Sequence, residues 1–174
     1  MKAVAVHPAH KELALIDVPR PSIVSPTEAR IRILEVGVCG TDREICAFEY
    51  GTPPDSAEHL VIGHECMGQV IEVGPGVTRV RVGDLVVPMV RRPCGVEGCT
   101  ACDAGRQDFC FTGRFRERGI REQHGFMTEE IVEDERWLNV LPPSLRAIGV
   151  LVEPLTIAEK ALAQVPDNLL RTSL

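Results

Sequence analysis

Apolar and polar residues alternate along several short stretches in the first half of the chain. The stretches are KAVAVH, ELALIDV, the longer ARIRILEVGVC, GQVIEVG and DLVVP. Such alternation is typical of β-strands that bury one face. Glycine and proline separate the stretches, as in GPG, and mark turns. Many short strands with tight turns predict a small, strongly bent β-barrel.

Helical patterns are few. The stretch TDRE at 41–44 has the spacing of a capping box and predicts a short helix directly after Cys39 and Gly40. GFMTEEIVEDERWLNVLP predicts one or two further strands. EPLTIAEKALAQV then predicts a helix with Pro154 in its first turn and with one apolar face, formed by Leu155, Ala158, Ala161, Leu162 and Val165. We expect a mainly β domain over residues 1–165 and a tail, 166–174, that is too short to add an element.

Length and charge exclude several classes of protein. The chain has 174 residues and a formal net charge of −6, which suits one domain and argues against a nucleic-acid partner. Residues 91–121 are rich in arginine, and we favour a solvated loop face there over a polyanion or phosphate site. No apolar run approaches the roughly 18 residues that span a bilayer, and no signal peptide opens the sequence. We therefore expect no membrane partner and a cytoplasmic protein with reduced thiols.

Four cysteines gather in the stretch PCGVEGCTACDAGRQDFC: Cys94, Cys99, Cys102 and Cys110. Four thiolates around zinc form a stable site without a surrounding core. The C-x-x-C pair alone could form a redox site, and chance proximity is a third interpretation. We favour structural zinc because two further cysteines flank the pair. A four-thiolate site is coordinatively closed, so the predicted lobe, about residues 91–113, would perform no chemistry.

A second set of possible ligands is spread along the chain. Cys39 in VGVCGTD and His64–Glu65 in IGHECMG each lie beside glycine at the end of a predicted strand. A lone cysteine or histidine is more often a core residue. Together with a carboxylate, however, they form the mixed set that catalytic zinc uses, with one position left open. Glu153 in LVEPL is either a further ligand or an acid stabilised by a helix N-terminus.

The combined motifs resemble the zinc-containing alcohol dehydrogenase family. GHECMGQVIEVGPGV fits that family's signature. CGTD lies upstream of it, and RVGDLVVP and then the cysteine lobe lie downstream, in the family's order. The resemblance covers Met1 to about Gln164. VRRPC, GRQDFC, ERGI, HGFM and LVEPL resemble the glucose (aldose) 1-dehydrogenase branch. Sorbitol- and threonine-type dehydrogenases share several of these motifs and stay as alternatives.

The resemblance implies a GroES-like β-barrel that binds two zinc ions per chain. It implies that Cys39 and His64 ligate the catalytic zinc. Glu65 and Glu153 would supply carboxylate ligands, directly, through water or in exchange with substrate, so Glu153 is also a candidate substrate-binding residue. The resemblance also implies a sugar substrate, oxidised by hydride transfer to NAD or NADP. The family commonly has two residues between its first two lobe cysteines, whereas four separate them here, which leaves Cys94 open to question as a ligand.

Two further roles follow from the resemblance. Thr41 matches the hydroxyl that passes the substrate proton toward the cofactor ribose, although the residue could also cap the predicted helix. Glu117 matches an acid that accepts hydrogen bonds from substrate hydroxyls, and its alternative is a surface glutamate among arginines. Cys46 and Cys66 fall outside both sets and are expected to be free core thiols.

A cofactor-binding motif is missing from the sequence. No G-x-G-x-x-G stands between a strand and a helix, and GPGVTRVRVG is better explained as a turn. Members of the family continue into a Rossmann domain, which we expect to be absent from these residues. We therefore expect the catalytic half of a dehydrogenase, with little turnover alone and with possible self-association through the apolar helix face. The alternatives are a non-catalytic zinc-binding GroES-like module and a zinc hydrolase.

Overall fold

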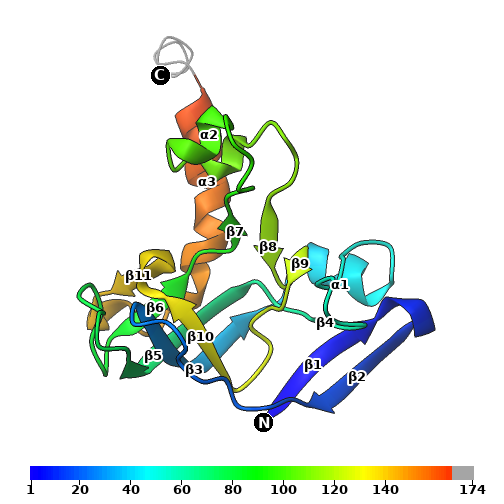
Figure 1. The fold of residues 1–174 in the computed structure, drawn as a ribbon, viewed down its shortest axis with the longest axis horizontal. Coiled ribbons are helices and arrows are strands. Elements are labelled where there is room, and N and C mark those ends of the chain that lie inside the picture. Colours follow the sequence, from blue (N-terminus) through cyan, green and yellow to red (C-terminus); the bar gives the residue numbers. More distant parts are fainter. Residues whose placement is uncertain (166–174) are drawn as a thin grey trace.

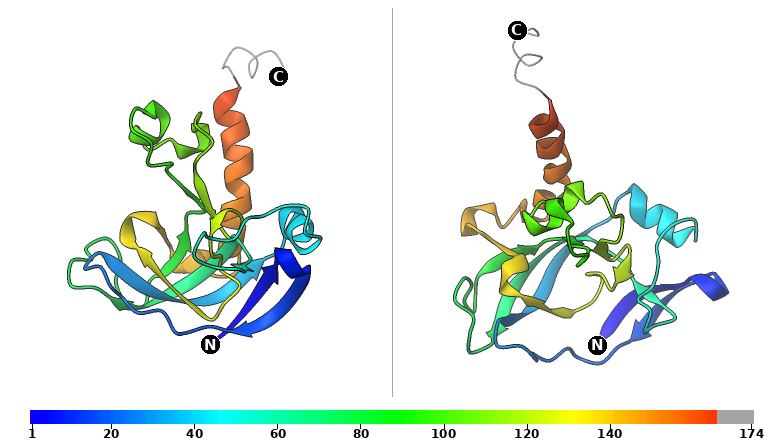
Figure 2. Two further views of the ribbon diagram at one scale, coloured as in Figure 1. Left: turned by 45° about the vertical axis from the view of Figure 1, so that its right-hand side comes forward. Right: turned by 45° about the horizontal axis from the view of Figure 1, so that its top comes forward.

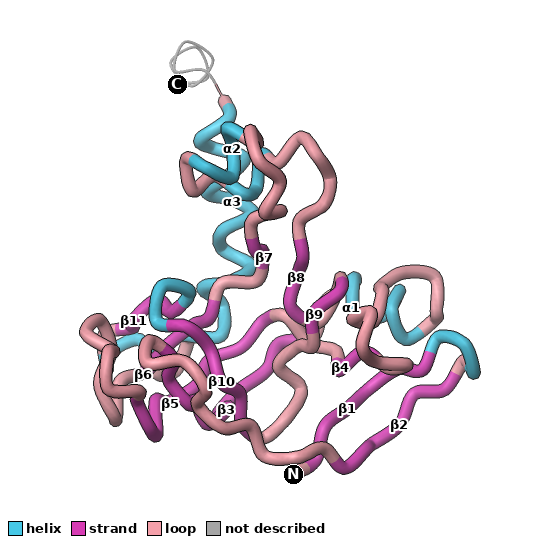
Figure 3. The backbone as a smooth tube through the Cα atoms, viewed as in Figure 1, coloured by secondary structure: helices cyan, strands magenta, loops and turns pink. Residues whose placement is uncertain are grey.

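The computed structural model describes residues 1–165, and the predicted tail lies outside the described residues. Figure 1 shows a β domain from which a small lobe and the helix α3 both project. From two further directions, the lobe and α3 rise from the same side of the β domain (Figure 2). The lobe is largely loop, with short strands at its base (Figure 3).

The strands of the described residues form three sheets. The first has the order β2-β1-β4 and consists of β1 (Lys2–His7), β2 (Glu12–Asp17) and β4 (Leu60–Val61). The second has the order β10-β3-β5-β6-β11 and consists of β3 (Glu28–Gly37), β5 (Glu65–Val73), β6 (Leu85–Pro88), β10 (Glu130–Asp134) and β11 (Leu138–Leu141). The third has the order β7-β8-β9 and consists of β7 (Arg91–Arg92), β8 (Arg116–Arg118) and β9 (Glu122–Gln123).

The large sheet bends around the main core. The pairing of β3 with β5 shifts register twice along its length, and such irregularities bend a strand. Ile31, Val70 and Phe126 are buried on the inner side. The segment that leads into β10 joins this sheet to the first one, since the Val4 N–H donates to the carbonyl of Met127 at 2.9 Å. The prediction of a mainly β domain is confirmed. The predicted bent barrel takes the form of three separate sheets within residues 1–165, two of which this segment connects.

The helices are short except for the last. The α-helices are α1 (Gly40–Cys46), α2 (Thr100–Asp103) and α3 (Val152–Gln164). The single-turn 3-10 helices are η1 (Pro8–His10), η2 (Gln107–Phe109), η3 (Glu135–Trp137), η4 (Pro143–Leu145) and η5 (Gly149–Leu151). Within residues 1–165 no helix has both the length and the apolar character needed to cross a membrane.

The predicted cap of α1 is wrong by two residues. The N-cap is Cys39, whose extended backbone precedes the helix, and the third helical residue is Asp42. The Asp42 carboxylate accepts the Cys39 N–H at 3.0 Å and closes the capping box. Thr41 therefore lies within the first turn and does not cap the helix.

The arginine-rich segment is only partly a solvated loop face. Arg92 is 4% exposed, and its guanidinium donates to Glu133 on β10 at 2.6 Å. Arg118 donates to the same carboxylate oxygen at 3.1 Å. Because a buried carboxylate needs charged partners, these two arginines are held inside and tie the base of the lobe to the large sheet.

Candidate metal centres

The antiparallel pairing of β3 with β5 builds the first candidate centre. The last residue of β3, Gly37, pairs with the first residue of β5, Glu65. Cys39 follows β3 after one further residue, and His64 directly precedes β5. Antiparallel strands place the end of one beside the start of the next. Two segments that are distant in the sequence thus deliver a thiol, an imidazole and a carboxylate to one place.

Gly37 makes room for the carboxylate of Glu65. A Cβ atom at Gly37 would lie 2.1 Å from Oε2 of Glu65 and 3.0 Å from its Cβ. Any larger residue at this paired position would push the acid away. The glycine in VGVC is therefore required by the side chain that faces it across the sheet.

The three predicted ligands meet within bonding range of one ion. Sγ of Cys39 lies 3.1 Å from Nε2 of His64, and both lie within 4.8 Å of a carboxylate oxygen of Glu65. His64 is buried, whereas Cys39 and Glu65 are half-buried. A thiolate, an imidazole and a carboxylate at this separation are the donor set that suits zinc with an open position. The chemistry and the spacing of the donors therefore fit the metal that the sequence implies.

Asp42 supports this centre and was missed as a site residue by the sequence analysis. It is 2% exposed, one carboxylate oxygen accepts the Cys39 N–H, and the other lies 3.5 Å from Nδ1 of His64. Burial lowers the pKa of His64, but the hydrogen bond and the charge of Asp42 outweigh burial and raise the pKa to about 9. At neutral pH both ring nitrogens then carry a proton, and a metal ion would replace the proton on Nε2, the nitrogen that faces Cys39. The aspartate three residues after Cys39 in CGTD was the signal.

Glu153 approaches the centre from the far end of the chain. It lies in the first turn of α3 and is half-buried. Burial raises its pKa, the charge of His64 lowers it, and the charge of Glu65 raises it, so the three side chains share one electrostatic environment. Glu153 is not within the 4.8 Å set of Cys39, His64 and Glu65. Its electrostatic coupling to His64 and Glu65 shows that it lies near the centre, and its role as a further carboxylate ligand stays a prediction.

A close contact between Gly149 and two apolar side chains precedes α3. A Cβ at Gly149 would lie 2.4 Å from Sδ of Met67 on β5 and 2.7 Å from Cδ1 of Leu141. Only glycine lets η5 pack this closely on the sheet. Because α3 follows η5 directly, the contact brings Glu153 toward the start of β5.

Thr41 and Glu117, the two other predicted site residues, differ in burial and in hydrogen bonding. Thr41 is half-buried in the first turn of α1, beside Cys39, and its hydroxyl makes no hydrogen bond within residues 1–165. Glu117 is 7% exposed on β8, so the interpretation as a surface glutamate is wrong. Its carboxylate is paired with Arg91 on the neighbouring strand β7.

The second candidate centre is the four-cysteine lobe. The sulfur atoms lie within 4.8 Å of one another, and they belong to Cys94, Cys99, Cys102 and Cys110. The long spacing after Cys94 does not exclude it from the group, because two glycines with positive φ, Gly95 and Gly98, let the extra residues loop out. Backbone N–H groups point at the sulfurs, as from Val96 to Cys94 at 3.4 Å.

The lobe thiols shift one another's pKa values. The Thr112 hydroxyl lowers the pKa of Cys110 to about 6. At Cys102 the N–H of Cys94 lowers the pKa, but burial and the neighbouring thiols outweigh it and raise the pKa to about 12. The neighbouring thiols thus favour the thiolate at Cys110 and disfavour it at Cys102, whereas a shared cation would favour the thiolate at all four positions. The set therefore fits a closed zinc site.

The remaining two cysteines lie outside both sets. Cys66 is buried in the main core, where burial raises its pKa well above that of an ordinary thiol. Cys46 is half-buried at the end of α1. Both are free thiols, as expected.

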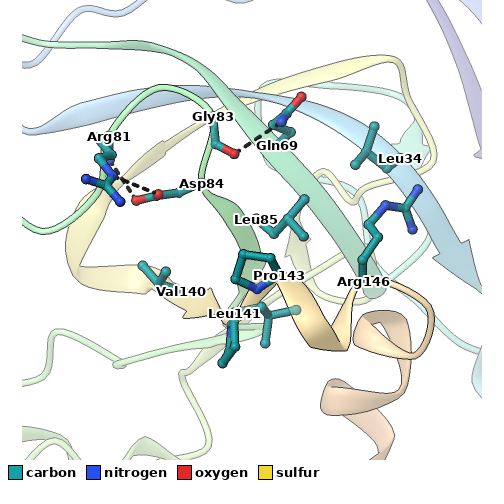
Figure 4. A pocket seen from close by; sticks show the side chains of 11 residues that line it. Leu34, Gln69, Arg81, Gly83, Asp84, Leu85, Val140, Leu141, Pro143 and Arg146 are labelled. Atoms are coloured by element: carbon teal, nitrogen blue, oxygen red, sulfur yellow. Dashed lines mark hydrogen bonds and ion pairs between the residues drawn. The ribbon is translucent and has the colours of Figure 1, made fainter.

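A hollow of about 800 Å³ lies away from both centres (Figure 4). The ion pair of Arg81 with Asp84 borders one side and Arg146 another. None of its lining residues is a predicted site residue. The hollow therefore has no assigned part in the chemistry of the two candidate centres.

Comparison with known proteins identifies the family of the chain. The model of the family described as alcohol dehydrogenase GroES-like domain matches residues 25–143. The chain belongs to this family. The GroES-like domain is 45% identical over 166 residues to a glucose 1-dehydrogenase of Methanocella arvoryzae, an alignment that covers 94% of this chain and 45% of the relative.

Solved structures show the same fold. The glucose dehydrogenase of Haloferax mediterranei, in complex with NADP, Zn and gluconolactone, superposes with a TM-score of 0.84 at 40% identity and covers 94% of this chain and 45% of that one. Galactitol-1-phosphate dehydrogenase of Escherichia coli gives a TM-score of 0.76 at 25% identity and covers 90% and 43%. The GroES-like domain described here thus spans about half the length of the relatives it matches.

Proposed function

We propose that this chain is the zinc-binding catalytic part of an NAD(P)-dependent glucose or aldose 1-dehydrogenase. The observation that carries the proposal is the 3.1 Å separation of Cys39 Sγ and His64 Nε2 beside the carboxylate of Glu65. Support comes from the relative of 45% identity that is named a glucose 1-dehydrogenase. A further support is the similar glucose dehydrogenase that binds NADP, Zn and gluconolactone.

Cys39, His64 and Glu65 would hold the catalytic zinc, with Glu153 as a further carboxylate ligand. A zinc ion held there would supply Lewis-acid chemistry, because it would lower the pKa of a sugar hydroxyl at the open position. Asp42 lies 3.5 Å from Nδ1 of His64 and would favour a proton on that nitrogen, which leaves Nε2 as the ligand atom. The lobe cysteines would hold a second, structural zinc.

Two side chains of the domain would handle the substrate itself. The Thr41 hydroxyl, which makes no hydrogen bond within residues 1–165, can accept the proton of a sugar hydroxyl and pass it on. The carboxylate of Glu117 can accept hydrogen bonds from the remaining sugar hydroxyls. NAD or NADP would be bound by a Rossmann domain, for which the 174 residues show no motif. We therefore expect little turnover from these residues alone.

Metal analysis tests the two centres separately. We expect two zinc ions per chain in the wild type, and one in Cys39→Ser, with the lobe ion retained. Cys46→Ser is the matched control, because Cys46 is a half-buried thiol outside both sets, and it should keep both ions. A wild-type chain with one ion, lost only when the lobe cysteines are replaced, would instead support a non-catalytic zinc-binding module.

An activity assay tests the reaction. The protein is assayed as its gene encodes it, including any sequence that follows Leu174, with glucose, other aldoses and polyols and with NAD and NADP. We expect aldose-dependent reduction of the nucleotide, abolished by Cys39→Ser and retained by Cys46→Ser. Oxidation of polyols only would favour the sorbitol-type alternative, and ester hydrolysis lost in Cys39→Ser would favour a zinc hydrolase.

A further inference from the structure

The carboxylate of Glu117 is held from one side only. Arg91 donates to Oε1 twice, from Nε at 2.9 Å and from Nη2 at 2.7 Å. The two residues face each other directly across β7 and β8. Within residues 1–165, Oε2 receives no hydrogen bond, and it is not among the buried polar atoms that lack a partner. One oxygen is therefore anchored, while the other is accessible to a ligand.

Anchoring of this kind gives Glu117 a fixed direction. A carboxylate on a residue that is 7% exposed is unstable without a charged partner. Arg91 supplies that partner and holds Oε1 of the carboxylate with two N–H groups of its guanidinium. The free oxygen still has lone pairs for hydroxyl donors. A side chain that is ordered before the ligand arrives loses less conformational entropy on binding.

The lobe in turn fixes Arg91. Nη1 of Arg91 donates to the carbonyl of Asp108 at 3.4 Å and lies 3.6 Å from the Asp108 carboxylate. The guanidinium also stacks over the ring of Phe115, 4.1 Å from its centroid. Asp108 precedes Cys110 by two residues, so its position depends on the four-cysteine fold.

The same carbonyl also binds α3. Nζ of Lys160 donates to the carbonyl of Asp108 at 3.3 Å. Lys160 belongs to the helix whose first turn carries Glu153. Asp108 is therefore a junction through which the lobe contacts both the partner of Glu117 and the helix that holds Glu153.

We propose that Arg91 is a positioning residue for Glu117 in sugar binding and that the lobe acts on the substrate site through the contact of Arg91 with Asp108. The inference rests on the proposed sugar dehydrogenase function. It gives the closed four-cysteine lobe a second role beyond holding its own loop. Arg91 touches Glu117 and not the substrate, so its effect should appear in the binding of the sugar.

The test compares Arg91→Met with the wild type in the protein as encoded. We expect the KM for the aldose to rise about tenfold or more, because the lost hydrogen bonds join two charged groups. The kcat, the KM for the nucleotide and the content of two zinc ions should stay within about twofold of the wild type. Arg91→Lys, which keeps the charge but loses the fork, should restore part of the sugar affinity.

Two comparisons separate positioning from a general structural role. Arg116→Met is the matched control: Arg116 is exposed on the same strand as Glu117 and forms no ion pair within residues 1–165, so all constants should stay unchanged. In a Glu117→Gln background, Arg91→Met should add less than about twofold, since both changes remove the same interaction.

The outcomes distinguish the two proposals. Wild-type dehydrogenase activity with an unchanged sugar KM in Arg91→Met would overturn this inference alone. The inference is also overturned by loss of one zinc ion in Arg91→Met, or by effects of the two substitutions that simply add. A wild-type protein without sugar dehydrogenase activity would overturn the proposed function and, with it, the role of Arg91.

Discussion

Asp42 contacts two of the predicted ligands of the first centre, Cys39 and His64. Its carboxylate accepts the backbone N–H of Cys39 at 3.0 Å and faces Nδ1 of His64 at 3.5 Å. The capping box of a short helix and the orientation of an imidazole therefore depend on one buried side chain. Nothing in the alternation of the strands indicates this, because the contact depends on β3 and β5 being paired.

Replacing Asp42 with asparagine should weaken the first metal centre. Asparagine has one acceptor oxygen, whereas both the Cys39 N–H and the proton on His64 Nδ1 need one. We expect zinc affinity at this centre to fall about 10- to 100-fold, with the lobe ion unaffected. Competition with a chelator measures both ions. Asp55→Asn, at an exposed acid, is the control, and equal affinity in the two variants would contradict the supporting role.

Gly119 and Gly125 both pack against the backbone of Gly63, the residue that precedes His64. A Cβ at Gly119 would lie 2.2 Å from the carbonyl oxygen of Gly63, and one at Gly125 would lie 2.3 Å from the same atom. Gly119 also has a φ of +73°, in the region that favours glycine. This close approach fixes the backbone from which the imidazole projects.

Gly119→Ala should therefore damage both stability and the metal centre. We expect the free energy of unfolding to fall by about 2 kcal/mol or more, with reduced zinc affinity at Cys39 and His64. Gly83→Ala is the matched control, because φ is +98° there but no atom lies within 4 Å of the added Cβ, so only the backbone penalty of about 1 kcal/mol remains. Denaturant unfolding at one fixed zinc concentration compares the variants, and equal losses would show that the close contact is unimportant.

At the scale of elements, one buried ion cluster joins the lobe to the large sheet. Glu133 on β10 receives Arg92 of β7 at 2.6 Å and Arg118 of β8 at 3.1 Å. The guanidinium of Arg92 also lies 4.9 Å from the ring centroid of Trp137. Because β8 carries Glu117, this cluster fixes the strand on which the proposed substrate carboxylate lies.

Glu133→Gln should destabilise the domain strongly. The substitution leaves two guanidinium groups facing a neutral amide in a buried position, which costs about 3–5 kcal/mol. Thermal unfolding of the zinc-loaded protein measures the loss. Asp17→Asn removes an exposed ion pair with Lys2 and should leave the unfolding midpoint unchanged. A midpoint for Glu133→Gln that matches this control would mean that the cluster does not anchor the strand.

At the scale of the whole molecule, α3 presents an uncovered apolar face. Leu155 is 54% exposed and Leu162 is 61% exposed, as the helical pattern predicts. The helix rises from the β domain and is contacted near its middle by the lobe, through Lys160 (Figure 1). Apolar side chains of this size at the surface promote association.

We expect these 174 residues, taken alone, to self-associate as their concentration rises. The double variant Leu155→Lys, Leu162→Lys should lower the apparent mass toward that of one chain, measured by sedimentation equilibrium. Gln164→Lys adds charge at an exposed polar position of the same helix and should leave the association unchanged. A wild-type chain that stays monomeric at all concentrations would refute the expectation.

The sequence by itself determined the longer strands, the helix α3 and the grouping of the lobe cysteines. Alternation and helical spacing are properties of neighbouring residues, and the four cysteines lie in one local segment. The short strands β7, β8 and β9 escaped prediction because two or three residues carry no periodic pattern. The predicted cap of α1 lies two residues too late. Two residue pairs in this short stretch have the spacing of a capping box, Thr41 with Glu44 and Cys39 with Asp42, and the structure uses the second pair.

Only the tertiary structure decided which distant residues touch. The register of β3 against β5 put Glu65 opposite Gly37, and the packing of η5 on β5 brought Glu153 beside them. The anchoring of Glu117 by Arg91 follows from the pairing of β7 with β8. Residue type and local pattern set what each segment can form and which groups can bind a metal. Contacts between segments far apart in the chain decide which of these groups lie close together. The local pattern of residues does not indicate those contacts.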